Sequence, residues 1–180
     1  MRFSTIFAGA LSLTAFASAS PLTSRRISNV TVPANFYLVT TNQHTPLANS
    51  SALKNVSLTT LYDPNYQPDN FLRTIKPGFA FVPTFNISDG VLHCEMAGPH
   101  GVGDYEYNST HVYSGSELTF RAEYQGHGDL SLKHGYLLAV NGTASSWTIC
   151  ESKGEPVVEY KGKAEGCTPT YIQAVAQAPY

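Results

Sequence analysis

The sequence predicts a single all-β domain, and three observations lead to that expectation. Charged residues make up only 13% of the 180-residue chain, whereas it contains 11 Tyr and 9 Phe, and aromatic residues favour strands. Short apolar runs recur about every ten residues, separated by Gly, Pro, Asn or Asp. No window shows an apolar stripe with the helical period. We therefore expect a β-barrel, a β-trefoil-like fold or a β-sandwich.

Twelve segments have the length and composition of strands, because each is rich in β-branched, aromatic or other apolar residues and ends near a turn-forming residue. In chain order they are Phe36–Thr41, Asn55–Tyr62, Phe71–Ile75, Gly78–Phe85, Val91–Met96, Thr110–Tyr113, Glu117–Tyr124, Asp129–Lys133, Gly135–Val140, Trp147–Glu151, Pro156–Tyr160 and Thr170–Val175.

The clearest local unit is Tyr136–Val140, followed by Asn141-Gly142 and then by Ser146–Cys150. Asn-Gly readily adopts positive φ, so the pattern predicts a β-hairpin with Asn141 at an exposed tip. Side chains alternate along a strand, which places Trp147 and Cys150 on opposite faces. We expect Trp147 to lie in the core rather than to form a sugar-stacking platform.

Residues 1–19 have the three parts of a secretory signal peptide. Arg2 supplies the positive start, an apolar run extends from Ile6 to Phe16, and Ala17-Ser18-Ala19 forms a cleavage site of small residues. We expect cleavage after Ala19. The run is about half the ~20 residues that a membrane span needs, and the carboxyl end lacks the hydrophobic tail of a lipid-anchor signal. The sequence therefore predicts a secreted protein without a membrane anchor.

Residues 20–26 end in the dibasic pair Arg25-Arg26, which is typical of a propeptide processing site; the alternative is two solvated arginines in a flexible leader. Cleavage after Arg26 would leave residues 27–180 as the mature domain. That domain has 11 − 3 = 8 Lys+Arg against 13 Asp+Glu, a net charge of −5. Since no basic patch is present, nucleic acid is not an expected partner.

Six of the ten asparagines lie in Asn-x-Ser/Thr sequons with no proline in the middle. They are Asn29, Asn49, Asn55, Asn86, Asn108 and Asn141. Beside a signal peptide, these sequons predict a heavily N-glycosylated extracellular protein. Large glycans would restrict any binding surface to the area between them.

The chain has three cysteines, Cys94, Cys150 and Cys167. In an oxidising compartment two of them should pair, and three pairings are open. We favour Cys150 with Cys167, because both lie at the edges of strand-like runs. Cys94 would then be a buried free thiol; the alternative is a reactive nucleophile.

Two polar clusters have the composition of a catalytic or metal site. In the first, Asp104 and Glu106 would share one face of an extended segment flanked by His100 and His111, which suits a divalent metal or the acid and base of a glycosidase. The alternative is a solvated loop that ends in an edge strand. Adjacent residues on one strand lie too close together for the usual spacing across a glycosidic bond. Metal sites normally draw their ligands from several strands, so we do not expect a metal or a cofactor.

The second cluster is Gln125–Asp129 with His134, where His127 and Asp129 invite comparison with a catalytic triad. No nucleophile motif accompanies it, and glycines on both sides of His127 indicate a turn. His93 and Glu95 share a face of a core strand, so we expect one of them to be held by hydrogen bonds.

The last feature is a group of tyrosines within twenty residues, Tyr105, Tyr107, Tyr113 and Tyr124. Exposed rings would form a surface for stacking on sugars; the alternative is cross-strand packing inside an all-β fold.

Four segments taken in order resemble small secreted glycoproteins of filamentous fungi, and in plan the PhiA-type cell-wall proteins. They are Phe71–Ile75, Gly135–Leu138, Trp147–Cys150 and Cys167–Tyr171. The cysteine placement differs from the PhiA type. The resemblance implies a secreted or cell-wall location and carries no catalytic residues.

We therefore expect a non-enzymatic, secreted, glycosylated cell-wall or extracellular protein that binds wall polysaccharide or a host surface. The alternative function is a small secreted glycan hydrolase with Asp104 and Glu106 as its acids.

Overall fold

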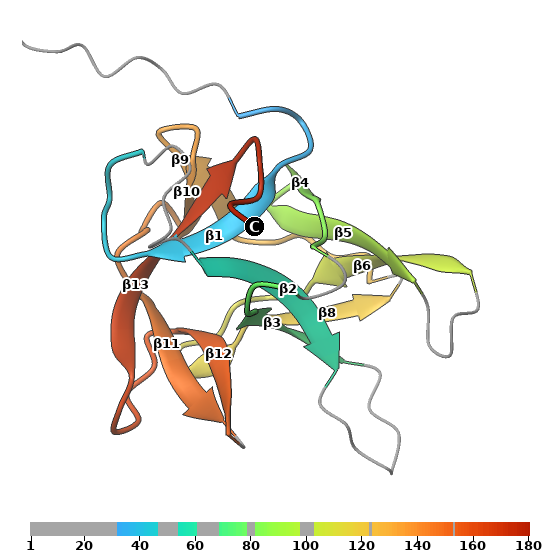
Figure 1. The fold of residues 1–180 in the computed structure, drawn as a ribbon. Coiled ribbons are helices and arrows are strands. Elements are labelled where there is room, and N and C mark those ends of the chain that lie inside the picture. The colour runs from blue at the N-terminus through green and yellow to red at the C-terminus, as the bar shows by residue number, and fades with distance from the viewer. Residues whose placement is uncertain are drawn as a thin grey trace, which may run out of the picture.

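The computed structural model describes residues 32–46, 54–60, 69–78, 82–97, 103–122, 124–152 and 154–180. Every regular element within them is a β-strand, and the strands form one antiparallel sheet (Figure 1). The all-β expectation is confirmed. The expected signal peptide (residues 1–19) and propeptide (residues 20–26) lie outside the described residues, as do Asn29, Asn49 and His100.

Thirteen strands lie within the described part of the chain. They are β1 (Tyr37–Thr41), β2 (Lys54–Thr60), β3 (Asn70–Thr74), β4 (Phe85–Ser88), β5 (Val91–Ala97), β6 (Asp104–Ser109), β7 (Ser116–Glu117), β8 (Thr119–Ala122), β9 (Leu130–Lys133), β10 (Leu137–Val140), β11 (Trp147–Ser152), β12 (Glu155–Tyr160) and β13 (Thr168–Val175).

The sheet curls into a barrel shape because β3 pairs both with β2 and, at Arg73–Val157, with β12. From β2 the sheet continues through β1, β13 and β11 back to β12, which completes a ring of six strands. On the same edge as β12, β3 also pairs with β8. From β8 the sheet continues through β6 and β5 to β4 (Figure 1). A bridge between Phe36 and Phe85 connects the end strand β4 with the residue just before β1. Of the three expected architectures, this arrangement matches the barrel.

The main hydrophobic core gathers side chains from most of these strands. Trp147 is completely buried in it, as expected, and its ring meets the edge of Tyr160 at a centroid distance of 5.3 Å. The indole Nε1–H donates to the Leu138 carbonyl at 2.8 Å, so its polar atom is satisfied. Phe85 and Phe120 are also fully buried, and burying a side chain of this size contributes about 1.5–3 kcal/mol.

Two expected strands are wrong in their bounds. No strand covers Thr110–Tyr113; the strand in this region is β6, which begins at Asp104 and pairs with β5 along five positions. The first three residues of β6 are exposed, and two of them are acidic. The search for apolar runs therefore did not identify this segment as a strand. Of the strand expected over Gly78–Phe85, residues 79–81 lie outside the described residues and residues 82–84 form no strand. Strand β4 begins at Phe85, after Pro83, which lacks the N–H that a central ladder position needs.

The expected hairpin around Asn141-Gly142 is also wrong, although its turn forms. Both residues are exposed, with φ angles of 48° and 75°. However, β10 pairs with β9 and β13, whereas β11 pairs with β12 and β13. The two segments meet instead through a side chain, because Trp147 reaches the backbone of β10.

Residues 124–130 lead into β9, and their last three residues pass directly against the β4–β5 turn; we call residues 124–130 the crossing segment. Gly128 N–H donates to the Asp89 carbonyl at 3.3 Å, and Leu130 N–H donates to the Gly90 carbonyl at 3.0 Å. A Cβ atom on Gly90 or on Gly128 would collide with the backbone carbonyl of the other. Only glycine therefore permits this contact.

Candidate functional site

Two of the expected glycosylation sites have exposed side chains. Asn141 lies at its turn, and Asn86 lies on β4, which ends the strand order of the sheet. Asn55 belongs to β2, where the side chains lie outside the described residues. Asn108 on β6 is different, because only 5% of it is exposed.

The four tyrosines do not form one surface. Tyr107 is 6% exposed and belongs to the core, so its place in the expected ligand surface is wrong. It pairs with Cys94 on β5 and Ala122 on β8, deep within the sheet. Tyr105 and Tyr113 are exposed, and Tyr124 is half-buried. Tyr105 precedes the buried part of β6 and Tyr113 follows it, so the two exposed rings lie beyond opposite ends of that part.

Tyr113 lies in a small polar and aromatic cluster. At 65% exposure, it is the most exposed large apolar side chain of the described residues. The His111 ring meets it edge-on at a centroid distance of 4.9 Å. Nδ1 of His111 lies 3.9 Å from Oδ2 of Asp129, whose side chain is only 10% exposed. His111 thus connects an open aromatic ring to a largely buried carboxylate.

His93 lies at the centre of a second polar cluster on the face of the sheet opposite Leu92 and Cys94, which are in the core. Strand register places it between Asn86 on β4 and Asn108 on β6. Nε2 of His93 is 2.8 Å from the Ser88 hydroxyl. Nδ1 is 2.6 Å from Oδ1 of Asn108 and 3.3 Å from Oε1 of Glu106. The expectation that hydrogen bonds hold either His93 or Glu95 is confirmed for His93.

The hydrogen bonds around Asn108 fix the proton position on His93. Nδ2 of Asn108 donates to the Tyr124 carbonyl at 2.9 Å, so Oδ1 must be the atom that faces the imidazole. Oδ1 can only accept, which places a proton on Nδ1. In the neutral ring Nε2 is then an acceptor for the Ser88 hydroxyl. In serine hydrolases the catalytic histidine is held in the same way: Nδ1–H donates to an oxygen acceptor, and Nε2 accepts from the serine hydroxyl.

The expected acids Asp104 and Glu106 are both exposed on β6. Glu106 contacts His93, and His111 contacts Asp129. Neither acid belongs to a group of three or more potential metal ligands within the described residues. Asp129 of the second sequence cluster lies within ion-pair distance of His111, which belongs to the first cluster. No such contact joins Asp129 to His127 or His134 among the described residues.

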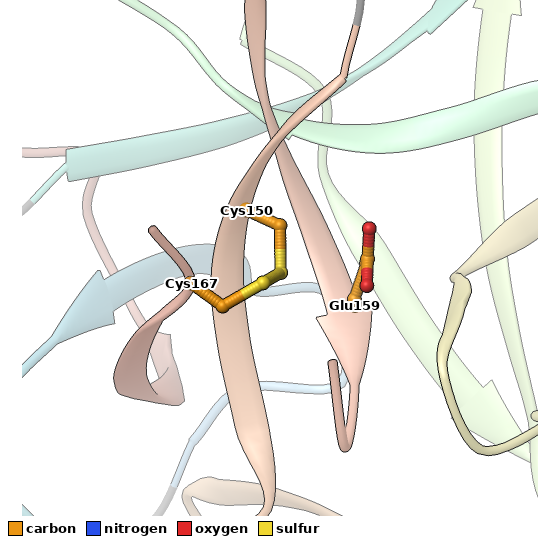
Figure 2. A group of neighbouring side chains, drawn as sticks. All are labelled: Cys150, Glu159 and Cys167. Atoms are coloured by element: carbon orange, nitrogen blue, oxygen red, sulfur yellow. A yellow bond between two sulfur atoms is a disulfide. The ribbon is translucent and has the colours of Figure 1, made fainter. Parts of the chain in front are cut away.

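The described residues contain one group of three potential metal ligands, Cys150, Glu159 and Cys167 (Figure 2). The two sulfur atoms form a disulfide, which confirms the expected pairing. Both thiolates are thereby used, so the group is no metal centre; the carboxyl of Glu159 lies beside the disulfide on the neighbouring strand (Figure 2). Cys94 is the buried free cysteine, as expected.

Charge is concentrated on the face of β12 that carries Glu159. Glu117 of β7 is its cross-strand partner, and Glu117 lies 3.7 Å from the buried Arg73. Nε of Arg73 and Oε2 of Glu117 are buried and have no hydrogen-bond partner among the described residues. Burial, and secondly the charge of Glu117, raises the pKa of Glu159.

Sequence reasoning did not find Ser88 and Asn108 as partners of His93. Both lie in sequons, which were interpreted as exposed glycosylation sites. Strand register would have found Asn108, because it lies directly opposite His93 on the next strand. Ser88 lies two residues beyond Asn86, the register partner of His93, so it is a diagonal neighbour.

Comparison with known proteins gives no match to a family model, to a curated protein or to a solved structure. A search of the described residues for a helix that is long and apolar enough to span a membrane finds none.

Proposed function

We propose that the protein is a secreted, N-glycosylated cell-wall or extracellular protein that binds polysaccharide around Tyr113. The observation that carries this proposal is the 65% exposure of Tyr113, because the other large apolar side chains of the described residues are mostly covered. An exposed ring of this kind can stack on the apolar face of a sugar. The disulfide supports an oxidising compartment.

The neighbours of Tyr113 supply the polar part of such a site. The exposed His111 ring packs against Tyr113 and offers a ring nitrogen to sugar hydroxyls. The Asp129 carboxylate lies 3.9 Å from Nδ1 of His111 and adds a negative charge beside the imidazole. A stacking ring with one adjacent polar side chain suits a weak, repeated contact with a polymer rather than a deep pocket for a small molecule.

The test is binding of the secreted, glycosylated protein to an array of wall polysaccharides and to host-cell surfaces. Tyr113→Ala should weaken polysaccharide binding about tenfold, because an aromatic contact contributes about 0.5–1.5 kcal/mol beyond its buried area. Tyr105→Ala is the matched control, since Tyr105 is exposed beyond the other end of the buried part of β6. Equal binding by Tyr113→Ala and the unaltered protein would reject Tyr113 as the site.

A second candidate function, hydrolysis, is favoured by the Ser88–His93 contact of 2.8 Å. In that reaction the Ser88 oxygen would attack an ester carbonyl while its proton passes to Nε2 of His93. The leaving alcohol would take that proton, and water would then release the acyl group. Labelling of Ser88 by a fluorophosphonate, lost in His93→Ala, would support it; an unlabelled Ser88 in the folded protein would exclude it.

A further inference from the structure

The two sequons that flank His93 occupy different environments. Register places Asn86, His93 and Asn108 side by side on β4, β5 and β6, and side chains at paired positions share one face of a sheet. Asn86 is at the end strand and is exposed, whereas Asn108 is covered. The same sequence motif therefore meets open solvent in one case and packed protein in the other.

Both the nitrogen and the oxygen of the Asn108 side-chain amide form hydrogen bonds within the protein. Its Nδ2 donates to the Tyr124 carbonyl at 2.9 Å, and its Oδ1 accepts from Nδ1 of His93 at 2.6 Å. An N-glycan is attached at Nδ2, the atom that faces the crossing segment. Since 5% of Asn108 is exposed, a sugar ring at this atom has no space unless the crossing segment moves away.

The opposite holds for Asn86. Its side chain is exposed, and it has one neighbouring strand, β5, because β4 ends the strand order. Ser88, the hydroxyl residue of its sequon, is also exposed. A glycan here extends into solvent without breaking any hydrogen bond of the His93 cluster that involves Asn108.

We propose that Asn86 carries a glycan in the folded protein and that Asn108 is unglycosylated despite its sequon. The role of Asn108 is then structural. The inference rests on the proposed function, because N-glycans are added in the secretory pathway. A chain modified at Asn108 cannot close the crossing segment over β6. Such chains would not reach the fold described above.

The first test is to secrete the full chain from a eukaryotic host and to map its peptides by mass spectrometry after enzymatic removal of glycans in heavy-oxygen water. The expected result is a label on Asn86 and none on Asn108. A labelled Asn108 in folded, secreted protein would overturn the inference.

Matched variants separate the two sites without altering either asparagine. Ser88→Ala removes the Asn86 sequon and should lower the intact mass by one glycan, whereas Ser88→Thr keeps the sequon and the glycan. Thr110→Ala removes the Asn108 sequon and should leave the glycan mass unchanged. Loss of a glycan in Thr110→Ala would overturn the inference.

The amino-terminal peptide distinguishes failure of the inference from failure of the proposed function. A secreted chain that begins after Ala19 but is bare at Asn86 would overturn the inference alone. A chain that keeps residues 1–19 and stays inside the cell would overturn the proposed function, and the inference with it.

Discussion

Glu117 and Glu159 lie opposite each other on β7 and β12, so two carboxylates share one face of the sheet. Burial and the Glu117 charge raise the pKa of Glu159 above its ordinary value of 4.5. A carboxyl group whose pKa is higher in the folded state stabilises the fold below its unfolded pKa. That stabilisation is lost as the pH rises through the folded pKa.

Glu159→Gln is therefore expected to raise the melting temperature at pH 7 and to change it little at pH 4. Thermal unfolding followed by circular dichroism at both pH values measures this difference. Glu155→Gln is the control, because Glu155 is an exposed glutamate of the same strand. An equal effect of Glu159→Gln at both pH values would contradict the prediction.

Asn108→Ala is expected to lower the free energy of unfolding by about 1–3 kcal/mol. It removes the Asn108 partner of the Tyr124 carbonyl and the shorter of the two hydrogen bonds of Nδ1 of His93, which keeps its contact with Glu106. Urea unfolding of protein produced without glycans measures the loss. Asn86→Ala, at the exposed end of the same row, should stay within about 0.5 kcal/mol of the unaltered protein. If both variants lose equally little, Asn108 is not a structural residue.

Removal of the disulfide should cost about 3 kcal/mol, the value for closing a loop of about 15 residues in the unfolded chain; Cys150 and Cys167 are separated by 17 positions. The double variant with Cys150→Ser and Cys167→Ser should match the reduced protein in its urea midpoint. Added dithiothreitol should then have no effect on that variant. An unchanged urea midpoint of the unaltered protein on reduction would contradict the prediction.

Cys94 should not react with iodoacetamide at pH 8 in the folded protein. Burial, and secondly the neighbouring Glu95 carboxylate, raises the pKa of the Cys94 thiol to about 12, and the thiolate is the reactive form. Alkylation should proceed once urea unfolds the chain. Mass spectrometry of the two samples distinguishes them, and full labelling without urea would mean that Cys94 is accessible.

The sequence was sufficient for features that depend on local pattern. The composition of short segments predicted the positions of most strands. Trp147, which we expected in the core, is completely buried. The disulfide could be inferred because Cys150 and Cys167 lie at the edges of strand-like runs, and the structure confirms it. These features depend on residues close together in the sequence.

Features that depend on the path of distant segments could not be predicted in this way. Asn108 is buried because the carbonyl of Tyr124, sixteen positions later, lies over it, and a sequon carries no information about such a cover. Tyr105 and Tyr107 share a face by the period of two, yet the core covers Tyr107 alone. Asn141-Gly142 specified a turn but not the partner of the strand that leaves it.

The contact between Gly90 and Gly128 has a consequence for local opening. The crossing segment donates to the carbonyls of Asp89 and Gly90 through the N–H groups of Gly128 and Leu130. Both bonds join the same two segments, which lie in direct backbone contact, so we expect them to break together when the segment lifts. The amides of Gly128 and Leu130 therefore belong to one cooperative unit and exchange their hydrogens with solvent at a common free energy of opening.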